Sequence, residues 1–382
     1  MIPEAIIHVG AGKCGSSSIQ KALSRCTDKM KNQGILYHPI GSNHFNYSTL
    51  LGGKTRGNNE KAFSSAKQNV SEVHQAIMSD EPNFVIFSGE SLFNIDPDKI
   101  IELIDFIFPG TPKIHIIAYI RQPAEGYLSH VQQRLKGSGK IIPPQSYKPP
   151  IRGKLPAWNE NDRLDSINIR HFNRSHLVNQ SAVADFSDIL SNITQRRIIL
   201  PEDENNTSLS SEQMIVLQRF RRVALSEHEG KLHPLSNSLI NFFHELNKTR
   251  GIVKSRPRTK PCIKNYIRRR FSDQIQEMEK IFPGLYFNSQ NELENDESYI
   301  EIEHQASVDK LLDEWDSDTV RILNSLLPQF SEEPGRAWFY EAITNFNSLA
   351  PSKSAKAAYK KFLVISGYPQ LDPYAEEEDT NL

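Results

Sequence analysis

Glycine, lysine and serine gather in one short segment near the start of the chain. Residues 8–20 read H-V-G-A-G-K-C-G-S-S-S-I-Q, in which Lys13 is followed by the serines Ser16, Ser17 and Ser18. Glycines let the backbone turn so that its N–H groups face inward, and the N-terminus of a following helix adds partial positive charge. Serine hydroxyls can donate to the same oxygens. The segment therefore predicts a binding site for a phosphate-like anion.

The position of the lysine argues against a nucleoside triphosphatase. A loop of that class reads G-x-x-x-x-G-K-[ST], with the lysine directly after the last glycine. Here Ser16 follows Gly15, and the lysine stands earlier, at Lys13. The strands predicted to end at Phe87 and Ile120 are followed by Ser-Gly-Glu and Arg-Gln-Pro, without an obvious aspartate for magnesium. Metal-dependent phosphoryl transfer is disfavoured, and we expect no metal.

A second pair of residues could bind another phosphate. Arg121 stands at the end of an apolar strand, and Ser129 lies eight residues further along the next helix. An arginine at a strand end and a serine two helical turns later can converge on one dianionic phosphate through charge-assisted hydrogen bonds.

These two motifs resemble those of the sulfotransferase family, in particular bacterial and carbohydrate-modifying members. The segment Lys13-Cys14-Gly15-Ser16-Ser17-Ser18 resembles the 5′-phosphosulfate loop, and Arg121-Gln122-Pro123 with Ser129 resembles the 3′-phosphate element. The resemblance covers roughly residues 5–200, and it departs from the family where threonines often replace Ser16 and Ser17. It implies 3′-phosphoadenosine 5′-phosphosulfate (PAPS) as donor, the bisphosphate PAP as product, and donor binding by Gly12 to Ser18, Arg121 and Ser129.

Sulfuryl transfer also needs charge neutralisation on the leaving group and a base for the acceptor proton. Lys13 is the candidate for the first task. The candidate base is Glu90, because it follows a strand end and the carboxyl ends of strands border the ligand crevice in open α/β sheets. It also resembles the Ser-x-Glu of carbohydrate sulfotransferases. His44 is the rival base, although a surface role is the more ordinary interpretation, and His8 is expected to be a buried structural residue.

A basic run lies later in the chain. Residues 254–270 hold eight lysines and arginines without one acid. The run could be a solvated face, a nucleic-acid patch, or a loop that covers the donor phosphate as in related enzymes. Lys254 and Arg256 are the candidates for donor contact, whereas sparse aromatic residues disfavour nucleic acid.

The predicted elements would place these residues at one edge of a sheet. Short apolar runs at 5–9, 34–37, 83–87, 113–120, 166–172 and 196–200 predict strands, and helical patterns at 18–26, 59–78, 97–108, 124–135 and 181–193 alternate with them. Strands that bury both faces indicate a parallel sheet covered by helices on both sides. We expect an α/β, P-loop-like three-layer fold with a largely helical C-terminal half.

The chain is long enough for more than one domain. Its 382 residues predict an α/β domain at 1–204, a helical region at 205–350 and a partly loose acidic tail at 351–382. Five prolines between Ile141 and Trp158 predict an irregular insertion loop at 141–158. Beyond residue 205, helices are expected at 210–225, 234–248 and 261–282.

Composition limits the classes of protein that remain. The net charge is −1, from 45 basic and 46 acidic residues, so no global field favours nucleic acid or an anionic membrane. No window approaches a membrane-spanning helix, and the opening residues lack the features of a signal peptide. Three scattered cysteines predict neither a disulfide framework nor a zinc site. A cytoplasmic location is the default expectation, and oligomeric state is left open.

The leading hypothesis is a PAPS-dependent sulfotransferase that acts on a hydroxyl or amine of a small-molecule or glycan acceptor. The acceptor's identity and the choice between Glu90 and a histidine as base stay open. One alternative is a nucleotide-dependent small-molecule kinase of related fold. Another is a non-catalytic protein that keeps nucleotide binding.

Overall fold

The protein is described here by a computed structural model. It describes residues 2–38, 45–52, 59–202, 208–233, 236–237, 239–244, 256–285, 299 and 301–325. The chain divides into two compact units. The first comprises Met1–Gly126, Pro149–Asn206 and Arg268–Leu293, and the second comprises Tyr127–Lys148, Thr207–Ile267 and Glu294–Leu382. Neither unit is continuous along the chain, unlike the division expected near residue 204.

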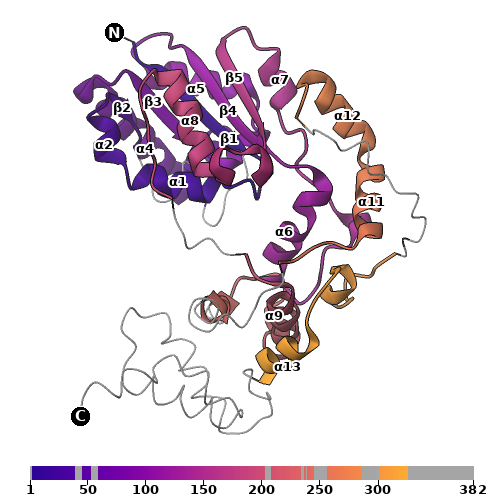
Figure 1. The fold of residues 1–382 in the computed structure, drawn as a ribbon. Helices are drawn as coiled ribbons and strands as arrows, with labels where there is room; N and C mark the ends of the chain where they lie inside the picture. Colours follow the sequence, from indigo (N-terminus) through magenta and orange to yellow (C-terminus); the bar gives the residue numbers. More distant parts are fainter. Residues whose placement is uncertain are drawn as a thin grey trace, which may run out of the picture. The chain divides into compact units, whose positions relative to one another are not determined.

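The first unit contains a parallel five-stranded sheet, which confirms the expected α/β class (Figure 1). Its strands lie in the order β2-β3-β1-β4-β5, and every neighbouring pair is parallel. Their bounds are β1 Glu4–Gly10, β2 Ile35–Leu36, β3 Phe84–Ser88, β4 Ile114–Ile120 and β5 Leu164–His171. Strands β3 and β4 are buried along their whole length, as their mostly apolar sequences predict.

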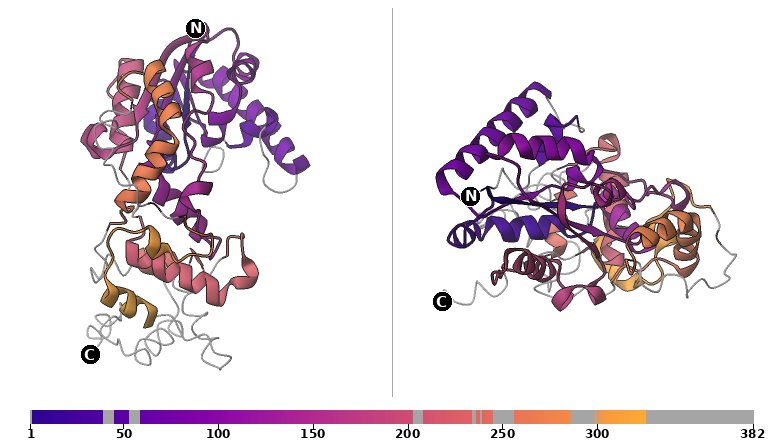
Figure 2. Two further views of the ribbon diagram at one scale, coloured as in Figure 1. Left: turned by 90° about the vertical axis from the view of Figure 1, so that its right-hand side faces the viewer. Right: turned by 90° about the horizontal axis from the view of Figure 1, so that it is seen from above.

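Helices cover both faces of this sheet. In the right-hand view of Figure 2, α1 (Ser16–Ser24) and α8 (Ala182–Thr194) lie on one side, and α4 (Asn59–Asp80) and α5 (Pro97–Ile107) lie on the other. Asp96 caps α5 by accepting from the Asp98 N–H, and Pro97 opens the helix. Shorter helical elements of this unit are α2 (Thr27–Lys31), α3 (Phe45–Leu50), η1 (Glu90–Asn94), η3 (Arg174–His176) and η4 (Val178–Gln180).

The strand expected at 196–200 does not form. Ile198 and Leu200 are buried and Ile199 is 68% exposed, so the segment has the alternating burial of a strand. Its backbone bonds to side chains of α8, however. The Ile198 N–H donates to Ser191 Oγ at 2.9 Å, and the Leu200 N–H donates to Ser187 Oγ at 3.2 Å. The segment is therefore extended, and its N–H groups at Ile198 and Leu200 find acceptors on α8 instead of on a neighbouring strand.

The proline-rich segment is more ordered than predicted. It contains the 3₁₀ turn η2 (Pro144–Ser146) and the helix α7 (Leu155–Asn159), and the side chain of Trp158 is fully buried. Pro156 occupies the second position of α7, where a missing N–H costs nothing because the first-turn donors have no intrahelical acceptor. The expectation of an irregular insertion loop is wrong for these residues.

The second unit consists of helices and turns. It contains most of α6 (Pro123–Leu135), then α9 (Ser211–Ala224), η5 (Ser226–His228), η6 (Val308–Leu311) and α13 (Ser317–Ser325). A capping box at Ser210 and Gln213 begins α9. The single helix expected at 261–282 is two helices, α11 (Pro261–Arg270) and α12 (Ser272–Ile281), because the backbone leaves the helical conformation at Phe271. The second of them, α12, belongs to the first unit. The helix expected at 234–248 falls partly outside the described residues.

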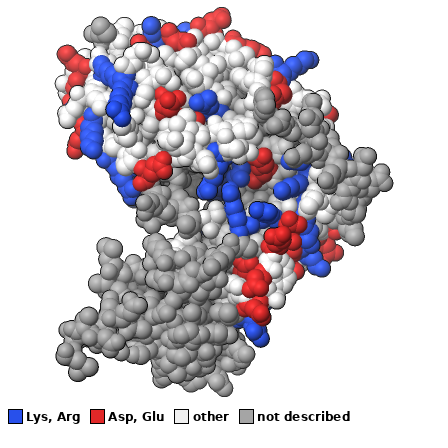
Figure 3. Space-filling model, viewed as in Figure 1, with Lys and Arg blue, Asp and Glu red and all other residues white. Residues whose placement is uncertain are grey.

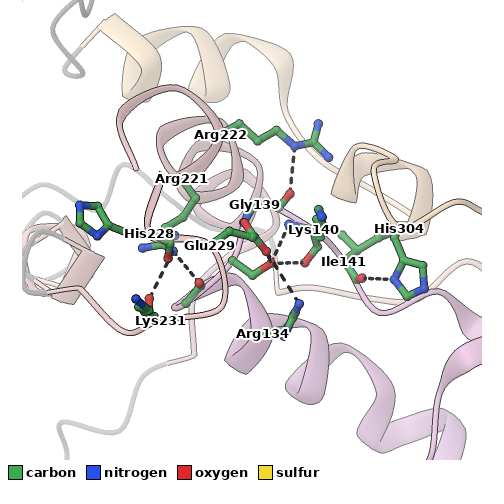
Figure 4. Close-up of polar contacts among 12 residues, drawn as sticks. Arg134, Gly139, Lys140, Ile141, Arg221, Arg222, His228, Glu229, Lys231 and His304 are labelled. Atoms are coloured by element: carbon green, nitrogen blue, oxygen red, sulfur yellow. Dashed lines mark hydrogen bonds and ion pairs between the residues drawn. The ribbon is translucent and has the colours of Figure 1, made fainter. Parts of the chain in front are cut away.

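A buried arginine organises this second unit (Figure 4). Arg221 on α9 is fully buried, and its guanidinium donates to the carbonyls of Gly137, His228 and Lys231 and to Ser236 Oγ. Next to it, Glu229 accepts from Ser138 Oγ and from the Gly139 N–H. These bonds fix the turns that connect α6 and α9 to the rest of the unit.

Charge on the described surface is mixed, as the net charge of −1 predicts. Basic and acidic side chains are interspersed on the face shown in Figure 3. In the described part of the chain, we find no helix with both the length and the apolar character needed to span a membrane.

Candidate functional site

Strand order identifies the edge of the sheet at which a ligand would bind. From β1 the chain passes to β2 on one side, and from β4 it passes to β5 on the other side. The connections that leave β1 and β4 therefore run in opposite directions. In open α/β sheets, ligands bind outside the carboxyl ends of the strands at such a switch point. The residues that follow β1, β3, β4 and β5 are the candidates.

The turn after β1 has an unusual backbone. Lys13 has φ 69° and Gly15 has φ 80°, so both lie in the left-handed region. Such a conformation costs a non-glycine residue about 1 to 2 kcal/mol, and strain of this kind is concentrated at functional sites. Gly15 is the N-cap of α1, and it makes no side-chain capping bond. The side chain of the N-cap residue therefore satisfies none of the N–H groups in the first helical turn of α1, which lie next to residues 10–15.

Two neighbouring segments pack closely against Gly15. A Cβ atom there would lie 2.8 Å from the ring of Phe172 and 2.9 Å from the Cβ of Ala182. Phe172 follows β5 and donates its N–H to the Ile120 carbonyl at 2.7 Å. A side chain at position 15 would therefore need both a left-handed backbone and displacement of two packed groups. The turn is shaped by the ends of β5 and α8 as well as by its own sequence.

The three serines of the turn differ in exposure. Ser16 is 5% exposed, whereas Ser17 is exposed and Ser18 is half-buried. The Ser16 hydroxyl donates to Glu90 Oε2 at 3.2 Å. Glu90 begins η1, directly after β3, and its side chain reaches solvent. The carboxylate predicted as a base therefore lies against the first residue of α1.

Arg121 lies on the same edge, directly after β4. Its guanidinium packs over the Phe172 ring, with 5.7 Å between the guanidinium carbon and the ring centroid. Arg121 Nε is buried and has no hydrogen-bond partner among the described residues. A buried guanidinium nitrogen without an acceptor is costly, so this atom is one that a bound anion would satisfy.

The charges of Arg121 and Glu90 both shift the pKa of the Cys14 thiol. Burial raises the pKa of Cys14 to about 12, the positive charge of Arg121 lowers it, and the negative charge of Glu90 raises it. Both charges therefore lie within electrostatic reach of the turn. The thiol itself is 1% exposed and stays protonated at neutral pH.

A buried polar network supports the turn from below. His8 Nδ1 lies 2.8 Å from Ser88 Oγ, and Gln20 Nε2 donates to the same hydroxyl at 3.2 Å. The Gly89 N–H donates to the His8 carbonyl at 3.0 Å, which holds the end of β3 against β1. Burial lowers the pKa of His8 to about 3, so the ring is neutral near pH 7. His8 is a buried structural residue, as expected.

The first unit thus brings together Lys13, Cys14, Gly15, Ser16, Glu90 and Arg121. The sequence did not predict Phe172, although its place directly after β5 follows the same strand-end rule that singled out Glu90 and Arg121. Ser129 lies on α6 and Arg256 lies at the exposed surface, and both belong to the second unit. Their predicted contacts with the donor stay predictions. His44 and Lys254 lie outside the described residues.

Comparisons with known proteins add no assignment. The chain matches no protein-family model and no curated protein. Among the described residues, no group of three or more histidine, cysteine, aspartate or glutamate side chains could hold a metal ion.

Proposed function

We propose that the protein is a PAPS-dependent sulfotransferase with a P-loop-like fold, acting on a hydroxyl or amine of a carbohydrate-like acceptor. The observation that carries the proposal is the hydrogen bond of 3.2 Å between Ser16 and Glu90. It joins the turn after β1 to a solvent-accessible carboxylate that follows β3, at the same edge of the sheet. An anion site and a base in contact are what transfer of an anionic group to a hydroxyl requires.

The residues present fit the donor's phosphates. The N–H groups at the start of α1 suit the 5′-phosphosulfate, because they carry the positive end of the helix dipole and the first turn of α1 contains no acidic residue of its own. Arg121, with its buried Nε, suits a second phosphate at the same edge. Lys13 stands in the turn itself, where its charge can reach the oxygen that bridges phosphate and sulfate.

The chemistry is an in-line displacement at sulfur. The acceptor oxygen forms a bond to sulfur as the bond between sulfur and the bridging phosphate oxygen breaks. Glu90 takes the proton that the acceptor loses, and Lys13 neutralises the negative charge that develops on the leaving phosphate. Ser16 donates to one oxygen of the Glu90 carboxylate, which orients the other oxygen for proton removal.

The test combines binding and transfer. Calorimetry should detect PAP binding to the wild-type protein, and Lys13→Ala should weaken it. Incubation with ³⁵S-labelled PAPS and a panel of glycans, lipids and phenols should label at least one acceptor. A protein that ignores PAP and PAPS, and yet is folded by circular dichroism, would contradict the proposal.

A further inference from the structure

A separate cavity of about 260 Å³ lies beside β5, the outer strand of the sheet. Its walls are formed by the end of that strand, by His176 and by the turn that follows α12; the lining residues are Ile169, Arg170, His171, His176, Phe282, Pro283, Gly284 and Leu285. All of them belong to the first unit, and none is part of the candidate site around Lys13. The volume suits a small ligand rather than a drug-sized one.

The outer edge of β5 presents backbone N–H groups, beside C=O groups of the same residues, on this side. Phe172 donates its N–H to β4, and the direction of the N–H groups alternates along a strand. The N–H groups of Ile169 and His171 therefore point away from β4, toward the outer edge of the sheet. Since β5 is the last strand of the described sheet, no further strand of that sheet lies beside the Ile169 N–H.

Side chains add basic groups to the same cavity. His171 is 8% exposed, and its ring lies 5.0 Å from the ring of His176 in an edge-to-face arrangement. Arg170 is bound to the buried Asp185 through Nε, at 3.2 Å, and lines the cavity as well. None of the described residues that line the cavity is acidic. The lining thus combines two imidazoles, a guanidinium and outward-facing N–H groups, which all can donate to an oxyanion.

We propose that this cavity binds a small oxyanion, namely a carboxylate, sulfate or phosphate group. The proposal goes beyond the sulfotransferase assignment and does not depend on it. His171 and His176 are the side chains that would donate to the bound oxygens, and the edge of β5 contributes backbone N–H groups. Phe282 to Leu285 form the other side of the cavity.

Glu125 contacts His171, one of the residues that line the cavity. His171 Nε2 lies 3.4 Å from Glu125 Oε2, and Asn173 donates to the other carboxylate oxygen at 3.4 Å. Burial by itself would raise the pKa of Glu125, but the hydrogen bond and charge of His171, followed by the charges of Arg121 and Arg268, lower it overall. The carboxylate thus stays charged at neutral pH and holds the His171 ring in place.

The experiment is a titration of the full-length protein, labelled with ¹⁵N in its histidine side chains, with sodium sulfate. Sodium chloride at the same ionic strength is the reference. Ring signals are assigned through His171→Gln, His176→Gln and His74→Gln. We expect saturable shifts at His171 and His176 with sulfate, and none at His74, an exposed histidine on α4.

Two variants sharpen the result. In His176→Gln, the sulfate concentration that half-saturates the His171 shift should rise about tenfold, the usual effect of losing one charge-assisted hydrogen bond. In Lys13→Ala, which impairs the turn after β1, the His171 response should persist unchanged. Absence of a saturable shift at His171 in the wild-type protein would overturn the proposal. Equal shifts at His74 would do the same, because they would show a general effect of salt.

Discussion

The hydroxyl of Ser16 and the carboxylate of Glu90 meet at 3.2 Å, although 74 positions separate them in the sequence. The contact exists because β1 and β3 are neighbours in a parallel sheet, so the segments that follow them emerge at the same edge. It places a carboxylate beside the turn after β1, where we propose that the donor binds.

Glu90→Gln tests the role of this carboxylate. If Glu90 removes the acceptor proton, the substitution should lower turnover by roughly 10²-fold or more, because the amide cannot accept a proton. Affinity for PAP should stay within a few-fold, since the amide still fits beside Ser16. The matched control is Glu102→Gln, an exposed glutamate on α5, which should leave both values unchanged. Unchanged turnover in Glu90→Gln would exclude Glu90 as the base.

Arg121→Ala should weaken PAP binding by roughly 2 to 5 kcal/mol, because it removes a charge from a partly desolvated phosphate. Isothermal titration calorimetry measures the effect directly. Arg197→Ala, which removes an exposed arginine of the same unit, should have little effect. Equal affinities of the wild-type and Arg121→Ala proteins would show that Arg121 does not contact the ligand.

Gly15→Ala should disable the turn after β1. The left-handed backbone costs alanine about 1 to 2 kcal/mol, and the new methyl group would meet Phe172 and Ala182 at under 3 Å. We expect lower thermal stability and weaker PAP binding together. The double variant Gly15→Ala with Phe172→Ala removes the closer of the two contacts and should recover part of the stability. No recovery would mean that backbone strain, rather than the Phe172 contact, is the dominant cost.

His8 should make the protein sensitive to acid. Its pKa is about 3 in the folded state and 6.5 in the ordinary state, so the unfolded chain binds more protons between these values. The free energy of unfolding should therefore fall as pH decreases from 6.5 toward 3, at most by about 1.4 kcal/mol per pH unit from this residue. Denaturant titrations at pH 7, 6 and 5 would measure the slope. His8→Asn, which can still bond Ser88, should show a smaller slope than the wild-type protein.

Cys14 should be the slowest of the three thiols to react. Burial raises its pKa to about 12 and also blocks access, whereas Cys262 is half-buried. Since the thiolate is the reactive form, alkylation with iodoacetamide at pH 8 should modify Cys262 well before Cys14. Peptide mapping by mass spectrometry resolves the three sites. Modification of Cys14 at the rate of Cys262 would show that the turn opens readily.

The sequence predicted those parts of the fold whose physical cause is local. Mostly apolar runs predicted β3 and β4, and their position directly after strand ends predicted that Glu90 and Arg121 lie at the same edge as the turn after β1. Prediction from sequence failed where the structure of a segment depends on which other part of the chain it bonds to. Residues 196–200 have the burial pattern of a strand but bond to serines of α8, which no pattern within the segment reveals.

The other errors have similar causes. The proline content of residues 141–158 predicts irregular structure, but Pro156 lies in the first turn of a helix, where a proline is harmless. The contact of Phe172 with the Gly15 position depends on how β5 and α1 meet, so only the tertiary structure shows it. The helix break at Phe271 occurs without a glycine or proline at that position, so the sequence did not predict it.

The hydrogen bonds of Arg221 determine which positions of the second unit can change in sequence. Three of the groups that accept its hydrogen bonds are main-chain carbonyls, of Gly137, His228 and Lys231. A carbonyl is present whatever side chain a residue carries, so drift at His228 and Lys231 leaves these bonds intact. Replacement of the arginine itself would remove the hydrogen-bond donor of all three carbonyls at once. Among homologous chains we therefore anticipate an invariant guanidinium surrounded by turns of freely changing sequence.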